Sequence, residues 1–121
     1  MIPKGGYCMG AFMDKMSAYG VDTKTTLERF AGDERLYEKC FYIVLEDKNF
    51  EQLGNALSEQ NYDNAFSYAH AIKGMVGNMG LTPIYDVVSV ITDVLRVKDL
   101  SNIEQQYNDV KEQMAVLKSL A

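Results

Sequence analysis

The 121-residue sequence is poor in residue types that shape a fold or carry chemistry, with one histidine, two prolines, two cysteines and no tryptophan. Pro3 and Pro83 both lie outside the segments with periodic apolar residues, which favours helices because proline disrupts a helix interior. Cys8 and Cys40 have neither metal-ligand spacing nor a C-x-x-C arrangement. We therefore expect no metal site, and we interpret both as unpaired thiols in a reducing cytoplasm.

Basic clusters and long apolar runs are also absent. Lys and Arg number 12 against 17 Asp and Glu, and the formal net charge of −5 argues against a nucleic-acid binder. No segment approaches the roughly 18 uncharged apolar residues of a membrane span. Glycines interrupt the short apolar run at the N-terminus, where a signal peptide would lie. We predict a cytoplasmic protein that binds neither nucleic acid nor membrane.

The sequence does contain several amphipathic helices. From about Ser101 onward, apolar residues recur at steps of four and three, and Ser101 with Glu104 resembles a capping box. A preceding helix is expected to have Thr82 as its N-cap and Pro83 as its first residue. Residues 62–80 form a third, whose apolar stripe consists of Ala65, Ala69, Ile72, Val76 and Met79.

The first half of the chain is predicted to be helical as well. Residues 33–61 are expected to form either one long bent helix or two short ones, with a break near residues 47–49. Residues 7–31 are expected to add one or two short helices, the second capped by Asp22 and ended at Gly32. The fold class is therefore all-α, an antiparallel four-helix bundle with one or two additional short N-terminal helices.

This pattern fits one domain. We expect the bundle to span residues 21–121, and residues 1–20 to be an N-terminal extension or a short helix. Because such a bundle buries its apolar stripes internally, we expect a monomer.

The stretch "AHAIKGMVGNMGL", residues 69–81, contains the single histidine, His70, and three glycines within a predicted helix. Each interior glycine costs roughly 1 kcal/mol relative to alanine. On a helical wheel the apolar stripe lies about 180° to 260° from His70, so the imidazole is expected to face solvent. The residues within about 60° of it are Asp63, Phe66, Ser67, Lys73, Gly74, Gly77 and Leu81.

Lys73 lies one turn from His70, where its charge would repel a metal cation but would stabilise an anion on the imidazole. Other interpretations stay open on the residues alone. An isolated helical histidine is often incidental. A Ser-His-Asp hydrolase lacks a G-x-S-x-G motif, and a general-base enzyme would need a cleft around His70.

At these residues the sequence resembles the histidine-containing phosphotransfer (HPt) domains of multistep two-component phosphorelays. Their pattern, H-x-x-K-G followed by N-x-G, is matched by His70, Lys73, Gly74, Asn78 and Gly80. The similarity extends over roughly residues 20–120, and residues 20–47 are similar to the usual lead-in of bacterial members. The resemblance implies a four-helix bundle with the histidine on its second long helix.

The resemblance also implies a function. His70 would accept a phosphoryl group, through its outer ring nitrogen, from a receiver-domain aspartyl phosphate and pass it to another receiver. Lys73 would offset the phosphoryl charge, while Gly74 and Gly77 would give the partner access. Asn78 and Gly80 would act in ending the helix and in packing its C-terminal end.

The partner would be a response-regulator receiver or the receiver of a hybrid sensor kinase. Phe66, Ser67 and Leu81 are candidate partner contacts. The chain would be a carrier and not an enzyme, with no cofactor or nucleotide site of its own, because the receiver would supply Mg²⁺. The alternative is a helical interaction module that docks on receivers without carrying phosphate.

Overall fold

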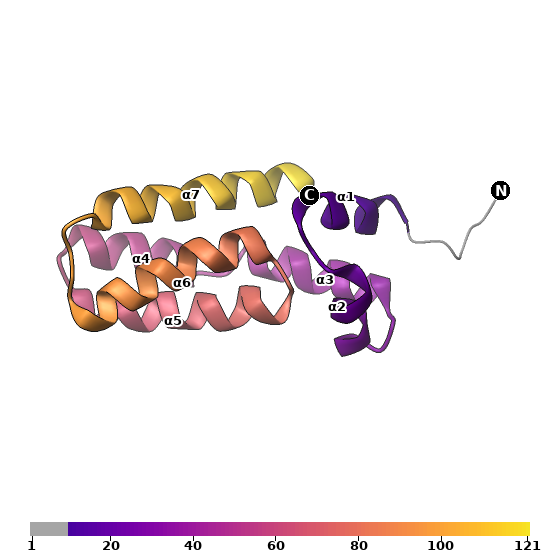
Figure 1. Cartoon of the computed structure of the whole chain (residues 1–121), viewed down its shortest axis with the longest axis horizontal. Helices are drawn as coiled ribbons and strands as arrows, with labels where there is room; N and C mark the ends of the chain where they lie inside the picture. The colour runs from indigo at the N-terminus through magenta and orange to yellow at the C-terminus, as the bar shows by residue number, and fades with distance from the viewer. Residues whose placement is uncertain (1–9) are drawn as a thin grey trace.

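Seven helices make up residues 10–121, the part of the chain that the computed structural model describes. They are α1 (Ala11–Tyr19), α2 (Thr23–Arg29), α3 (Glu34–Leu45), α4 (Asn49–Ser58), α5 (Tyr62–Asn78), α6 (Thr82–Val97) and α7 (Ile103–Leu120). In Figure 1 helices α4 to α7 lie along one another and alternate in direction, while α1 to α3 gather at the end where α5 and α7 finish. The predicted antiparallel four-helix bundle is confirmed, and α1 and α2 are the two short N-terminal helices.

The segment expected as one bent helix or two short ones forms two, α3 and α4. The break falls at residues 46–48, close to the expected position. There the Asp47 carboxylate accepts hydrogen bonds from the Asn49 backbone N–H (2.8 Å) and from its side-chain amide (2.7 Å). A short acidic side chain that binds the backbone two residues on competes with the helical ladder, so the chain turns before α4 begins.

One hydrophobic core joins all seven helices. All five predicted stripe residues of the third helix are buried, namely Ala65, Ala69, Ile72, Val76 and Met79. From α1, Met13 and Met16 are buried in the same cluster. Residues 1–9, which include Cys8, lie outside the described part of the chain, so the structure describes only α1 within the stretch expected as an extension or short helix.

Two predicted helix caps are wrong and one is confirmed. Asp22 caps α2 by accepting a hydrogen bond from the Thr25 N–H. The Ser101 hydroxyl instead donates to Asp99 at 2.6 Å, and α7 begins after Asn102 without a side-chain cap. Thr82 is the first residue of α6 and not its cap. A local sequence pattern does not reveal which of several competing side-chain hydrogen bonds forms.

The C-terminal end of α5 is held by the N-terminal helices. Arg29 of α2 donates to the Gly77 and Asn78 carbonyl oxygens, at 3.3 and 2.9 Å. The buried Tyr37 hydroxyl of α3 donates to the Met79 carbonyl oxygen at 2.7 Å. The last carbonyls of a helix have no intrahelical partner. The Gly77 carbonyl also accepts from the Gly80 N–H at 3.1 Å, so Arg29 and Tyr37 matter most for the Asn78 and Met79 carbonyls, to which they donate. Burial raises the pKa of Tyr37, which keeps this donor protonated.

Gly80 reverses the chain just beyond that point, as the sequence predicted. Its φ is +70°, in the left-handed region that favours glycine. A Cβ at this position would also collide with the Thr26 hydroxyl of α2. The turn that leads from α5 into α6 therefore requires glycine for both backbone and packing reasons.

We expect Tyr37→Phe to lower the free energy of unfolding by about 1 to 3 kcal/mol, because it leaves the buried Met79 carbonyl without a donor. Tyr42→Phe on the exposed face of the same helix is the matched control and should change stability by less than about 0.5 kcal/mol. Urea denaturation measures both. Equal losses in the two variants would contradict the capping role of Tyr37.

Candidate functional site

His70 lies on the outer face of α5 and is exposed, as the helical wheel predicted. The buried residues on either side of it, Ala69 and Ile72, point into the bundle. No side-chain hydrogen bond found within residues 10–121 involves either ring nitrogen; those made by α5 side chains involve Asp63 and Ser67 instead. An imidazole in this setting has a nitrogen lone pair available to an incoming electrophile.

The imidazole packs against an aromatic ring of its own helix. Phe66 lies one turn toward the N-terminus, and the two rings are stacked with centroids 5.8 Å apart and an interplanar angle of 18°. The Arg96 guanidinium of α6 lies 5.7 Å from the centroid of Phe66. Phe66 is half-buried and contacts both His70 and Arg96, and its role as a partner contact stays a prediction.

Lys73 lies one turn beyond His70 and leans toward α6. Its ammonium group is 6.0 Å from the ring centroid of Tyr85, and the side chain is only partly buried. Within residues 10–121 the ion pairs are Arg96 with Asp93 (2.7 Å) and Lys98 with Asp63 (3.0 Å). The charge of Lys73 is therefore not neutralised by a described carboxylate and is available to an anion beside His70.

The two glycines near His70 have different surroundings. A Cβ added at Gly74 would have no atom outside its own helix turn within 4 Å, so this position is open as predicted. A Cβ at Gly77 would lie 3.0 Å from the Tyr85 ring. The prediction that Gly77 clears space for a partner needs correction, because Gly77 accommodates Tyr85 of the neighbouring helix.

Leu81 cannot serve as the predicted partner contact. It is completely buried and ends the turn before α6, because the helix stops at Asn78 and the wheel angle no longer applies. Ser67 is exposed on the same face as His70, and so is Ala71, which the sequence reasoning did not select. Tyr85 and Arg96, which contact Lys73 and Phe66, were not among the predicted site residues, because the periodicity of the sequence does not define the register of α6 against α5.

A family model described as the Hpt domain matches residues 45–120, which is more than half of the chain. The chain belongs to the HPt domain family. No significant match was found among curated proteins or solved structures.

HPt domains are phosphocarriers that interact with receiver domains in phosphorelays. The match places α4 to α7 within the family pattern, together with His70 and Lys73. It begins at residue 45, so the resemblance expected for residues 20–44 lies outside it. That N-terminal part nevertheless supplies Arg29 and Tyr37, which bind the C-terminal end of the helix that carries His70.

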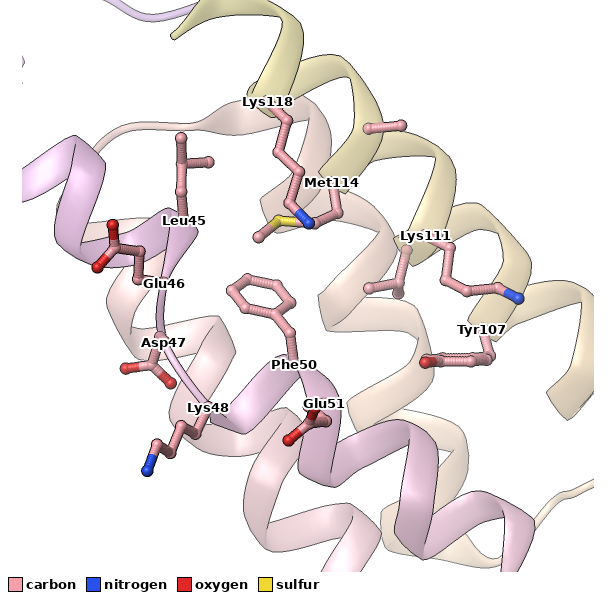
Figure 2. Close-up of a pocket in the computed structure, with 12 residues that line it drawn as sticks. Leu45, Glu46, Asp47, Lys48, Phe50, Glu51, Tyr107, Lys111, Met114 and Lys118 are labelled. Atoms are coloured by element: carbon pink, nitrogen blue, oxygen red, sulfur yellow. The ribbon is translucent and has the colours of Figure 1, made fainter.

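A groove lies elsewhere in the HPt bundle. It measures about 640 Å³ and runs between the α3–α4 break and α7, where Figure 2 shows Phe50 and Met114 at its centre and Lys111 and Lys118 along α7. None of the predicted site residues lines it. The cleft that a general-base enzyme would need around His70 is therefore not provided by this groove.

Residues 10–121 contain no group of three or more His, Cys, Asp or Glu side chains placed to hold a metal ion. Over the same residues, no helix combines the length and the apolar composition needed to cross a membrane.

We expect Gly74→Ala to raise the free energy of unfolding by about 0.5 to 1 kcal/mol, because the new methyl group meets open space and alanine favours the helix. Gly77→Ala is the matched comparison. It should gain less than Gly74→Ala or lose stability, because its methyl group would press on Tyr85. Urea denaturation of both variants measures the difference, and equal gains would contradict the assignment of Gly77 to packing.

Proposed function

We propose that this protein is a phosphoryl carrier that accepts a phosphoryl group on His70 from the aspartyl phosphate of one receiver domain and passes it to another receiver. One observation carries the proposal. In a chain of the HPt family, an exposed imidazole without a hydrogen-bond partner among the described residues lies one turn from an unpaired lysine and an open glycine.

The proposed step is a phosphoryl transfer between two nucleophiles. The lone pair of the outer imidazole nitrogen, Nε2, forms a bond to phosphorus while the bond between phosphorus and the aspartyl oxygen breaks. The electron pair of the broken bond returns to the receiver's carboxylate. Transfer to the second receiver reverses these roles. Mg²⁺ belongs to the receiver in this proposal, and this chain contributes the nucleophile and a cation.

Electrostatics supports the role of Lys73. A phosphoryl group brings a charge approaching −2, and an ammonium group on the next turn stabilises it. Lys73 is more suitable than Arg96 or Lys98, because each of those already pairs with an aspartate. Its contact with Tyr85 keeps the side chain along the seam between α5 and α6 without neutralising its charge.

The shape of the α5 surface supports docking by a receiver. Ser67, Ala71 and Gly74 are exposed, small and next to His70 along the helix, so another protein's loops can approach the imidazole closely. The proposal includes a cytoplasmic response regulator or hybrid kinase as the source of that receiver.

His70→Gln should abolish acid-labile labelling when the protein is incubated with a phosphorylated receiver, because glutamine has no nucleophilic ring nitrogen. Each receiver encoded in the same genome is tested as donor, and thermal unfolding confirms that the variant is folded. Label transfer that persists in His70→Gln would contradict the proposal. The non-phosphorylated interaction module predicts a different result, with no labelling of the wild type by any receiver and unchanged binding in His70→Gln.

Lys73→Ala should slow phosphoryl transfer by about tenfold, the effect of losing one charge-assisted contact. Because Lys73 is only partly buried, the free energy of unfolding of the Lys73→Ala variant should differ from the wild-type value by less than about 0.5 kcal/mol. Rapid-quench transfer assays and urea denaturation measure the two effects. A variant that unfolds while its remaining folded fraction transfers normally would instead make Lys73 a structural residue.

A further inference from the structure

We propose that Phe66 is a positioning residue for His70. Its stacked ring fixes the plane of the imidazole, so that the lone pair of the reacting nitrogen points toward the side from which a receiver delivers the phosphoryl group. The inference rests on the proposed function for its kinetic consequence. The stack itself is a property of the folded chain and can be tested without any receiver.

The geometry follows from the helix. Side chains lean toward the N-terminus of their helix, so His70 extends over the residue four positions before it, which is Phe66. Centroids 5.8 Å apart with rings 18° from parallel are typical of an offset stack between aromatic rings. Because the side-chain hydrogen bonds of α5 found among residues 10–121 involve Asp63 and Ser67 and not His70, the stack is the contact that orients the ring.

Phe66 is in turn held from the neighbouring helix. Arg96 lies over its ring at 5.7 Å and is fixed by an ion pair with Asp93 on the preceding turn of α6. A second ion pair, Asp63 with Lys98, joins the start of α5 to the residue after α6. The contacts of α6 with Asp63 and with Phe66 tie the first turns of α5 to the end of α6, so the position of Phe66 is set by tertiary structure as well as by its own helix.

Ring orientation affects the two possible kinds of donor differently. A receiver-bound phosphoryl group arrives along one line, and transfer requires the nitrogen lone pair to point along that line. A small donor such as phosphoramidate approaches a solvent-exposed nitrogen from many directions. Loss of the stack should therefore slow transfer from a receiver by a larger factor than labelling by phosphoramidate.

The stack can be detected directly by proton NMR on the untagged protein. His70 is the only histidine, so its two carbon-bound ring protons give an unambiguous pair of signals. In the wild type they should be displaced by the ring current of Phe66, and Phe66→Leu should remove the displacement while keeping apolar bulk. Phe66→Tyr should restore it. Identical imidazole signals in the wild type and Phe66→Leu would overturn the stack.

The kinetic test separates positioning from partner binding. Phe66→Leu should lower the maximal rate of transfer from a phosphorylated receiver by about three- to tenfold, as expected from the loss of one aromatic stack. The half-saturating concentration should stay within about twofold, and Phe66→Tyr should restore the rate. An increase in the half-saturating concentration at an unchanged maximal rate would overturn the proposal and make Phe66 a partner contact.

Arg96 lies over the ring of Phe66 and provides a second test of how that ring is held. Arg96→Lys keeps a cation over the ring and should stay closer to the wild type than Arg96→Gln in both the NMR signals and the maximal rate. Equal NMR signals and equal maximal rates in Arg96→Lys and Arg96→Gln would contradict the role of Arg96 in holding Phe66. If the wild type accepts label from neither a receiver nor phosphoramidate, the proposed function fails while the NMR result still decides whether Phe66 orients His70.

Discussion

The rotation of α5 about its own axis is the constraint on which the rest of the structure depends. Ala65, Ala69, Ile72 and Val76 are buried at helical spacing, so only one rotation removes all four from water. This rotation leaves His70 on the outer face. A rotation that buried the imidazole would expose part of the apolar stripe, which makes accessibility of the histidine a consequence of burying its neighbours.

The end of α5 depends on residues far away in the sequence. Arg29 and Tyr37 occupy its last carbonyls, and Thr26 fills the space that a side chain at position 80 would need. These residues lie outside the part of the chain that matches the HPt family. The N-terminal helices therefore complete the bundle that carries the histidine, and they fix where α5 stops and α6 starts.

The surroundings of His70 are asymmetric because α6 packs along only one side of α5. On that side the Tyr85 ring packs against Gly77, where a Cβ would lie, and Arg96 lies over the ring of Phe66. On the side away from α6, Ser67 and Ala71 are exposed, and their small side chains project little from the helix. The imidazole is therefore in contact with Phe66 on its own helix and open to approach across Ser67 and Ala71.

The sequence by itself determined the helices, the buried stripe of α5 and the exposure of His70, because these follow from the periodicity of one helix and from removing apolar side chains from water. It also indicated Gly80 as the end of α5. Only the tertiary structure decided the surroundings of Gly77, Leu81 and Phe66, because each depends on how α6 follows and packs against α5. Arg29 and Arg96 reach the site helix from other helices, and the periodicity of a single helix does not define that register.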